Sequence, residues 1–353
     1  MDDSGGEPYI PGGLNPPLAS AAALAADTRS LGDLLQEMSA DLALIEQAIG
    51  RIASPPAGYV KDLVEYVRGF GGKRLRPALV MICGRAIDPA VVGEVHARVG
   101  AVVELIHTAT LVHDDILDGA LLRRNHRTLH ELEGQEVAVL LGDFLLASAY
   151  AEAASLEDRY ASRYLSKVTR TVCQGEVLQV HNRGNIDLPQ SEYLEIIEKK
   201  TAVLYAASCE VGGRYAGGTD AHVRALHDFG MGIGMAFQIV DDVLDLTGDE
   251  AVVGKSLGTD LDRCKMTLPL IHFLREGPAA EVARVRSALT ARRGGAEAAM
   301  IRKAVIAAGS VEFARERAER FVQDAVASLA ALPESAAKAT LRRLAGYVLD
   351  RRR

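Results

Sequence analysis

The 353-residue sequence contains no tryptophan, and aromatic residues make up only 5% of it. Its four cysteines are scattered and form no CxxC pair, which suits a reducing compartment where they fill core space: Cys83, Cys173, Cys209 and Cys264. No apolar run is as long as a transmembrane helix requires, and the formal net charge of −7 offers no general surface for a polyanion. We therefore expect a cytoplasmic protein that is not an integral membrane protein and does not bind nucleic acid.

Aliphatic side chains at helical spacing are abundant. Hydrophobic residues make up 48% of the sequence, and Ala, Leu, Val and Ile recur with the helical period, without convincing period-two strand blocks. Residues 1–27 are rich in Gly, Pro and Ala, and we predict that they form a disordered tail. No shift in composition marks a second domain. Residues 28–353 are therefore predicted to form a single large helical bundle of the all-α class, with a central site between facing helices.

One acidic pattern occurs twice, as DDILD and as DDVLD. A helix brings residues i, i+3 and i+4 onto neighbouring positions. Each copy would therefore gather three carboxylates: Asp114, Asp115 and Asp118 in the first, and Asp241, Asp242 and Asp245 in the second. A single copy could equally be a solvated acidic face. Two copies flanked by hydrophobic residues favour sites for hard divalent metals, which prefer oxygen ligands and share them with substrate phosphates.

Basic residues gather at two places. GGKRLRP contains Lys73, Arg74 and Arg76 after two glycines that let the backbone approach a ligand, and Arg123 and Arg124 follow the first acidic motif. An isolated cluster of this kind would more often be a solvated turn. Cations beside metal-binding carboxylates are explained together if the ligand is a polyphosphate, which both would hold.

Single polar residues near the acidic motifs complete the candidate set: His107, Lys200, Thr201, Gln238, Lys255, Asp260 and Lys265. His107 lies two helical turns before Asp114, although a lone histidine there would more often belong to the core. The sequence shows no Ser-His-Asp arrangement, HExxH pair or GxxxxGK[ST] loop. Acyl transfer, zincin-type hydrolysis and P-loop nucleotide chemistry therefore have no support.

Five elements, in order, resemble those of the trans-isoprenyl diphosphate synthases, or polyprenyl synthetases, of medium- and long-chain type. They are GGKRLRP, HTATLVHDDILD, EKKTA, FQIVDDVLD and GKSLGTDLDRCKMTLP, and the resemblance runs from about Val60 to about Arg275. It implies an isoprenoid synthase fold and a Mg²⁺-dependent prenyltransferase that joins isopentenyl diphosphate head-to-tail to an allylic diphosphate. It also implies a homodimer.

The resemblance implies a role for each matching residue. The six aspartates of the two motifs would hold Mg²⁺ ions that bridge to the allylic diphosphate. Basic residues would contact the same diphosphate: Arg123, Lys200 and Lys255. Thr201 and Gln238 would offer oxygens near the developing allylic cation. Because the departed diphosphate would accept the proton that is lost, no protein general base is required.

A second group of residues would bind the diphosphate of isopentenyl diphosphate: Lys73, Arg76, His107 and Arg124. Lys265 completes the substrate-binding candidates. Two stretches depart from the family pattern. RRNHRT replaces the usual RRGxPT, which puts the shape of that loop in question, and Cys264 and Met266 stand where Gly and Pro are common. Since neither change removes a charged group, we expect activity to survive.

Small residues precede the first acidic motif where short-chain enzymes of the family place bulky aromatics. Ala109 and Thr110 would leave room for a growing chain to enter an apolar tunnel, whose floor would be deeper, at Ile106 or Phe144. The resemblance predicts a product longer than fifteen carbons, of about thirty to fifty carbons, in such a tunnel. Ala109 could instead simply pack closely against a neighbouring helix.

Other functions are compatible with parts of the pattern. The chain could be a geranylgeranyl diphosphate synthase, or the catalytic subunit of a heteromeric polyprenyl synthase. A class I terpene cyclase would need no second diphosphate site, whereas GGKRLRP, His107 and Arg124 indicate one. A regulatory subunit would usually have eroded aspartate motifs, and both motifs are intact here.

Overall fold

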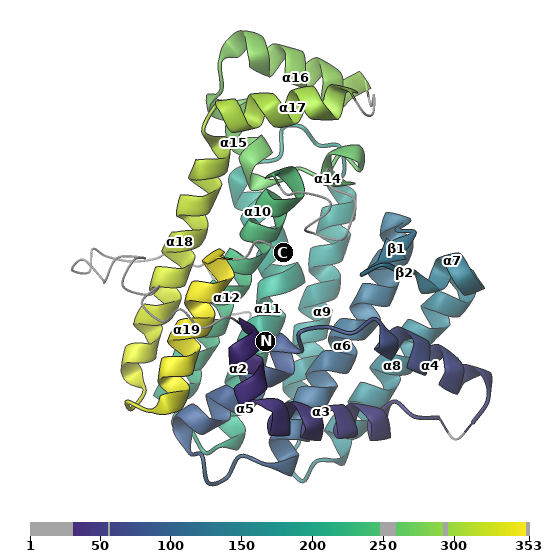
Figure 1. Cartoon of the computed structure of the whole chain (residues 1–353), viewed down its shortest axis with the longest axis vertical. Coiled ribbons are helices and arrows are strands. Elements are labelled where there is room, and N and C mark those ends of the chain that lie inside the picture. Colours follow the sequence, from purple (N-terminus) through teal and green to yellow (C-terminus); the bar gives the residue numbers. More distant parts are fainter. Residues whose placement is uncertain (1–30, 56, 248–258, 292–295, 351–353) are drawn as a thin grey trace, which may run out of the picture.

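A computed structural model describes residues 31–55, 57–247, 259–291 and 296–350, and these are almost entirely helical (Figure 1). The predicted all-α fold is therefore confirmed. The predicted disordered tail (residues 1–27) and Lys255 lie outside the described residues. The helices of the first half are α2 (Leu31–Glu37), α3 (Ser39–Ile52), α4 (Tyr59–Gly69), α5 (Leu75–Ile87), α6 (Glu94–Asp118), α7 (Leu129–Glu133), α8 (Gln135–Ser155) and α9 (Tyr160–His181).

The second half continues with α10 (Gln190–Ile197), the π-helical turn η1 (Glu198–Ala202), α11 (Val203–Tyr215), α12 (Asp220–Thr247), α14 (Thr259–Asp262), α15 (Leu268–Glu276), α16 (Ala279–Ala291), α17 (Ala296–Ala307), α18 (Ser310–Ser328), the 3₁₀ turn η2 (Leu329–Ala331) and α19 (Ala336–Asp350). Helices α16 and α17 form one end of the molecule, and α3 and α4 lie toward the other (Figure 1).

The 28-residue helix α12 is held by close backbone contact with its neighbours. It packs against α11, α18 and η1. A Cβ atom added at Gly234 would lie only 2.5 Å from the Cα of Ala202, and one at Gly232 would lie 2.7 Å from the carbonyl oxygen of Phe321. Larger side chains would push these helices apart. The second acidic motif therefore stands on a helix whose position the core determines closely.

The first acidic motif occupies the last turns of α6, a 25-residue helix that packs on α3, α5 and α8. Gly119 ends α6 in a left-handed conformation with φ of 58°, which glycine adopts without steric cost. By length and composition, α6 and α8 are apolar enough to cross a membrane. However, 67% of the most apolar stretch of α6 is buried inside the bundle, compared with 33% for α8. Helix α6 is therefore a core helix, whereas α8 leaves much of its apolar surface uncovered.

The departure from the family pattern at RRNHRT forms a tight β-hairpin. Strands β1 (Leu122–Arg123) and β2 (His126–Arg127) pair antiparallel, and Arg124 and Asn125 connect them with φ of 50° and 66°. Positive φ at both central residues is typical of a type I′ turn, and asparagine tolerates this conformation well. His126 stacks on Phe70 with ring centroids 5.8 Å apart. Asn125 thus accommodates the turn that the usual glycine would make.

Candidate active site

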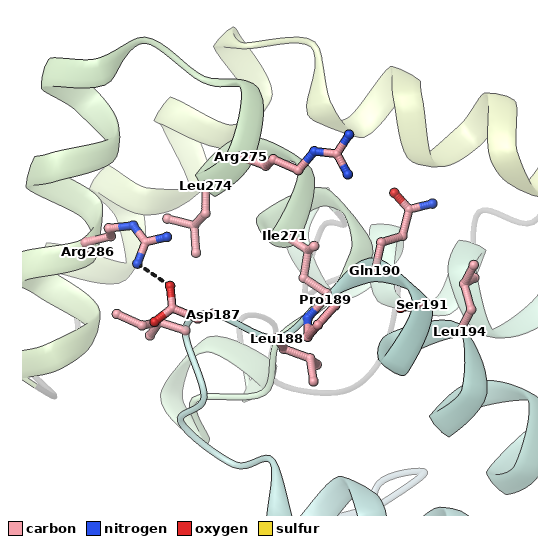
Figure 2. A pocket seen from close by; sticks show the side chains of 11 residues that line it. Asp187, Leu188, Pro189, Gln190, Ser191, Leu194, Ile271, Leu274, Arg275 and Arg286 are labelled. Atoms are coloured by element: carbon pink, nitrogen blue, oxygen red, sulfur yellow. Dashed lines mark hydrogen bonds and ion pairs between the residues drawn. The ribbon is translucent and has the colours of Figure 1, made fainter.

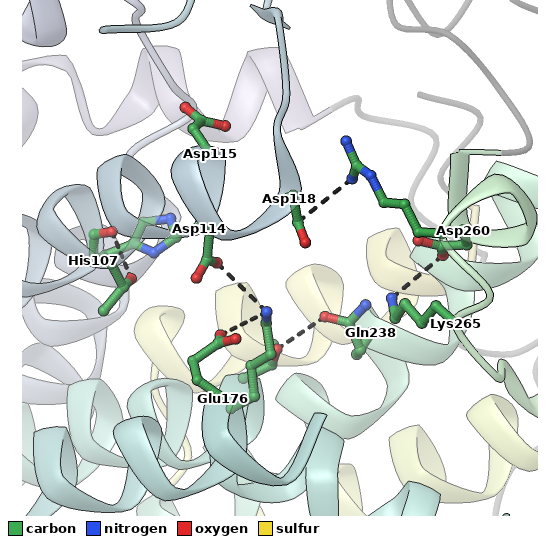
Figure 3. A network of polar contacts seen from close by, with 12 residues as sticks. His107, Asp114, Asp115, Asp118, Glu176, Gln238, Asp260 and Lys265 are labelled. Carbon is green, nitrogen blue, oxygen red and sulfur yellow. Dashed lines mark hydrogen bonds and ion pairs between the residues drawn. The ribbon is translucent and has the colours of Figure 1, made fainter. Parts of the chain in front are cut away.

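Two aspartates of the first motif, Asp114 and Asp118, lie on one face of α6 and meet basic side chains from distant parts of the chain (Figure 3). The ammonium of Lys200 lies 3.5 Å from Asp114 Oδ2. Arg183 donates to Asp118 Oδ1 at 2.8 Å, and Arg263 lies 3.4 Å from Asp118 Oδ2. The two carboxylate side chains are 15% and 25% exposed. We call Asp114 and Asp118 the first wall.

Asp115 does not join this face. Asp115 is rotated by about 100° from Asp114 on the helix, and Figure 3 shows its carboxylate pointing away from that of Asp114. It is buried and forms a bidentate ion pair with Arg123, whose Nη2 donates to Oδ1 at 2.7 Å and whose Nε donates to Oδ2 at 2.8 Å. Burial raises the pKa of Asp115, and the Arg123 guanidinium opposes that shift. This pair ties the β-hairpin to α6, and it occupies the arginine that we expected at the allylic diphosphate.

The second motif is more deeply buried. Asp242 is 1% exposed and Asp245 is 5% exposed. Asp242 accepts hydrogen bonds from three side chains: Tyr193 Oη at 2.7 Å, Gln238 Nε2 at 2.9 Å and Lys265 Nζ at 3.1 Å. The backbone N–H of Asp260 donates to Asp245 Oδ2 at 3.2 Å. We call Asp241, Asp242 and Asp245 the second wall.

Lys265 is the cation of the second wall. Its ammonium lies 3.1 Å from Asp242 Oδ1 and 3.3 Å from Asp260 Oδ2. Figure 3 shows the contact between Lys265 and Asp260. Burial alone would lower the pKa of Lys265, but the charges of Asp242, Asp260 and Asp241 raise it above the ordinary value. Lys265 therefore remains protonated. Burial raises the pKa of Asp242, and Lys265 counteracts that shift.

The second aspartate plays the same structural part in both motifs. Asp115 and Asp242 are the second residues of their motifs, and each is the most buried aspartate of its motif. Each pairs with a basic residue that follows later in the chain, Arg123 or Lys265. Burying one carboxylate in each motif requires such a partner. Each motif thus holds a cation in place through its second aspartate.

Lys200 and Thr201 lie in η1, a π-helical turn of the kind that often occurs at functional sites. Thr201 Oγ1 donates to Gln238 Oε1 at 2.9 Å, which links η1 to α12. Lys200 also forms an ion pair with Glu176 of α9 at 2.5 Å. Burial and the nearby charge of Asp114 raise the pKa of Glu176 to about 7. Glu176 belongs to none of the motifs that predicted the site from the sequence.

The basic residues expected to bind the diphosphate of isopentenyl diphosphate each contact a different part of the protein. Lys73 Nζ donates to the hydroxyl of Tyr347 in α19 at 2.8 Å, and the guanidinium of Arg76 lies 4.3 Å from the ring centre of Tyr205. Arg74, the third cation of that cluster, instead pairs with Glu46 and Glu104. Tyr347 is more than two hundred residues away in sequence, and no motif pointed to it.

His107 and Arg124 line one small cavity, together with Gly71 and Phe70. Arg124 donates to the carbonyl oxygen of Gly71, which connects the hairpin to the GGKRLRP segment. Burial lowers the pKa of His107 well below its ordinary value, and the neighbouring arginines lower it further. His107 is therefore neutral at pH 7 and can donate only one ring N–H.

The carboxylates of the two walls suit a hard divalent cation. Within the described residues, no three His, Cys, Asp or Glu side chains converge closely enough to hold a metal ion by themselves. Mg²⁺ keeps few protein ligands and completes its shell with water and substrate phosphates. The walls therefore fit ions that are shared between protein carboxylates and a bound diphosphate.

A larger cavity lies elsewhere, between the segment before α10 and helices α15 and α16 (Figure 2). Its volume is about 710 Å³, and Ile186, Leu188, Ile271 and Leu274 line it. Arg286 and Asp187 form an ion pair of 2.7 Å beside it. Since none of the motif aspartates lines this cavity, the chemistry of the motifs does not belong to it.

The all-helical bundle with two aspartate motifs, each paired with a buried or partly buried cation, is the architecture of an enzyme class that acts on diphosphates. A family model described as polyprenyl synthetase matches residues 58–307, and the chain belongs to this family. The resemblance seen in the sequence is therefore confirmed. The chain is a trans-polyprenyl diphosphate synthase, a prenyltransferase that uses isopentenyl diphosphate and an allylic diphosphate.

Relatives cover nearly all of the chain. It is 33% identical to octaprenyl diphosphate synthase of Escherichia coli over 320 residues, which cover 90% of this chain and 98% of that protein. It is 35% identical to heptaprenyl diphosphate synthase component 2 of Geobacillus stearothermophilus, covering 88% and 96%. The crystal structure of polyprenyl synthase from Caulobacter crescentus, complexed with calcium and isoprenyl diphosphate, matches with a TM-score of 0.86 at 32% identity, covering 93% and 99%.

Proposed function

We propose that this chain uses Mg²⁺ to elongate an allylic diphosphate to a polyprenyl diphosphate of about thirty to fifty carbons in an apolar tunnel. The observation that carries the proposal is that each wall has its own lysine between two carboxylates. Lys200 lies between Asp114 and Glu176, and Lys265 lies between Asp242 and Asp260. Carboxylates and ammonium groups that lie close together suit a diphosphate bound together with its metal ions.

The metal ions would be held by the four motif aspartates that are not paired with Arg123 or Lys265: Asp114, Asp118, Asp241 and Asp245. When bound, Mg²⁺ would stabilise the charge of the leaving diphosphate. Asp115 and Asp242 would act mainly through the cations that they hold, Arg123 and Lys265. Lys200 would contact the allylic diphosphate, and Lys255 would do the same from outside the described residues.

Thr201 and Gln238 would stabilise the allylic cation through a chain of hydrogen bonds. Asp242 accepts from the Gln238 amide, and the Gln238 carbonyl oxygen accepts from the Thr201 hydroxyl. The Thr201 proton is therefore directed toward Gln238, which leaves the oxygen lone pairs of Thr201 available for developing positive charge. This arrangement costs no reorganisation when the carbon–oxygen bond breaks.

Isopentenyl diphosphate would bind at the second group of residues: Lys73, Arg76, His107 and Arg124. The supporting observations are the cavity that His107 and Arg124 share and the neutral state of His107, which lets it donate without adding charge. Lys73 would exchange the Tyr347 hydroxyl for a phosphate oxygen. A separate anchor for this substrate holds its double bond close to the allylic carbon.

The length of the product would depend on the level just below Asp114. Thr110 lies one turn before Asp114 and is partly exposed, whereas Ala109 is fully buried. We infer that Thr110 borders the space for the prenyl chain and that Ala109 supports it from behind. Ile106, which is fully buried, and Phe144 of α8 remain the candidates for the floor.

We also propose that the chain forms a homodimer through the outer faces of α8 and α9. Leu140 is 67% exposed on α8 and Val177 is 67% exposed on α9, and these helices contact each other. Exposed apolar side chains on adjacent helices favour a protein partner. A relative named as component 2 makes a second kind of subunit the alternative. The cytoplasmic location stays a prediction.

Mass spectrometry of the products tests the proposal. The purified chain would receive Mg²⁺, isopentenyl diphosphate and farnesyl diphosphate, and a ladder ending at one dominant length is expected. Chelation of the metal should abolish the ladder, and size-exclusion chromatography of the same sample would report the oligomeric state. If geranyl and geranylgeranyl primers also failed with Mg²⁺ present, the chain would need a partner subunit or would be a cyclase.

A further inference from the structure

Glu176 lies outside both aspartate motifs but touches their chemistry. It is in α9, and its carboxylate lies 2.5 Å from the ammonium of Lys200. The same ammonium lies 3.5 Å from Asp114 Oδ2, and Figure 3 shows Glu176 and Asp114 converging from two different helices. The side chains of Glu176 and Asp114 are each 15% exposed, and that of Lys200 is 19% exposed. One lysine is thus clamped between a motif aspartate and a glutamate that belongs to no motif.

The backbone beside Glu176 is built for this contact. A Cβ atom added at Gly175 would lie 2.5 Å from the backbone nitrogen of Lys200 and 2.9 Å from its Cα. Only glycine allows α9 to approach η1 so closely. The next residue, Glu176, is therefore held at a short and defined distance from the Lys200 side chain. The neighbouring lysine does something different: Lys199 pairs with Glu195 at 2.6 Å within its own segment.

We propose that Glu176 is a positioning residue that holds Lys200 in the orientation in which it contacts the allylic diphosphate. Lysine carries a flexible four-carbon stem, and fixing it costs conformational entropy that a strong hydrogen bond offsets. An ammonium has three donors, so one can bind Glu176 while the others point at phosphate oxygens. When a metal ion engages Asp114, Glu176 is the carboxylate that still holds Lys200. This inference rests on the proposed role of Lys200.

Whether the loss of Glu176 weakens or strengthens diphosphate binding distinguishes a positioning role from a purely electrostatic one. Removing the negative charge of Glu176 would, by Coulomb attraction alone, strengthen binding of a diphosphate. If Glu176 acts by placing Lys200, the same change weakens binding instead.

The second wall contains a similar pair, in which Asp260, a carboxylate outside the motif, contacts Lys265.

Steady-state kinetics with four variants tests the inference: Glu176→Ala, Lys200→Ala, the double variant and the control Glu195→Ala. We expect Glu176→Ala to raise KM for farnesyl diphosphate about tenfold, as for one hydrogen bond to a charged group. KM for isopentenyl diphosphate should stay unchanged. The Kd of farnesyl thiodiphosphate, a slowly reacting analogue, should rise in parallel. Glu195→Ala should behave as the wild type.

The double variant decides whether Glu176 acts through Lys200. We expect it to be no worse than Lys200→Ala alone, because the glutamate has no lysine left to place. Additive losses, or an unchanged or lower KM in Glu176→Ala, would overturn the inference. An unchanged KM in Lys200→Ala would instead refute the proposed role of Lys200. Glu176→Gln, which keeps the shape and one acceptor oxygen, should lose less than Glu176→Ala and serves if the alanine variant does not fold.

Discussion

The two acidic walls share a five-residue pattern but are built in different ways. On the first wall, Asp114 and Asp118 are partly exposed and meet charged partners from η1 and from the segments after α9 and α14. On the second wall, Asp245, which corresponds to Asp118, is only 5% exposed. Asp242 is held by the neutral donors Tyr193 and Gln238 as well as by Lys265, whereas its counterpart Asp115 is held by Arg123. The same local sequence therefore yields an adaptable wall on α6 and a preorganised wall on α12.

The packing of the two helices explains this difference. Glycines bring α12 into backbone contact with η1 and α18, so its motif is enclosed by other helices. The motif of α6 lies in its last turns, next to the hairpin and to connecting segments. An enclosed carboxylate can accept hydrogen bonds from neutral side chains on neighbouring helices. The more exposed carboxylates of the first wall instead pair with long, charged side chains from connecting segments.

The largest expected effect concerns catalysis, in which both walls should be equally necessary. Asp114→Asn and Asp241→Asn should each lower kcat/KM for farnesyl diphosphate by about 10²–10³-fold, because each would remove a group that supports the leaving charge. Asp143→Asn, which changes an exposed aspartate of α8, is the matched control. A large loss of kcat/KM in only one of the two variants would contradict the claim that both walls are equally necessary.

The second prediction separates the walls by stability. Asp242→Ala removes the acceptor of Tyr193 and the more buried of the two carboxylates beside Lys265, and it should cost about 3–5 kcal/mol of unfolding free energy. Asp118→Ala breaks partly exposed ion pairs and should cost less than about 1 kcal/mol. Urea unfolding of both variants measures the difference. Equal losses would show that the second wall is no more preorganised than the first.

A third prediction concerns the space beneath the first wall. Thr110→Phe should shorten the product, because Thr110 is partly exposed below Asp114. Ala109→Phe should shorten it as well, but overpacking of a fully buried position should also cost about 1–3 kcal/mol of stability. Product mass spectrometry and thermal unfolding would be run on the same preparations. An unchanged product distribution in both variants would contradict the proposed tunnel.

The smallest expected effect is the change of folding stability with acid, to which His107 and Asp242 contribute with opposite signs. Burial lowers the pKa of His107, so as pH falls through about 6.5 the unfolded state binds a proton before the folded state does, and stability is lost. Burial raises the pKa of Asp242, so there the folded state binds the proton first and stability is gained. His107→Gln should therefore flatten the loss of stability between pH 7.5 and pH 5.5. A loss as steep as in the wild type would exclude His107 as its source.

Much of the candidate site was predictable from local patterns. Helical spacing placed Asp114 and Asp118 on one face, and the glycine and arginine content of GGKRLRP marked a basic turn. Helical spacing did not separate Asp115 from Asp118, three residues later, and the pairing of Asp115 with Arg123 was visible only in the tertiary structure. Glu176, Tyr193, Arg183, Arg263 and Tyr347 could not be found in this way, because each reaches the site from an element remote in sequence.

By itself the sequence determined the all-helical class, the two carboxylate clusters and the family, because helical periodicity and motif order are local properties of the chain. Only the tertiary structure decided that the second aspartate of each motif is buried against a cation from a later segment of the chain. It also decided which wall is buried and which carboxylate clamps Lys200. These outcomes depend on how closely helices from distant segments approach one another, and steric contact between backbones, as at Gly175 and Gly234, determines that distance.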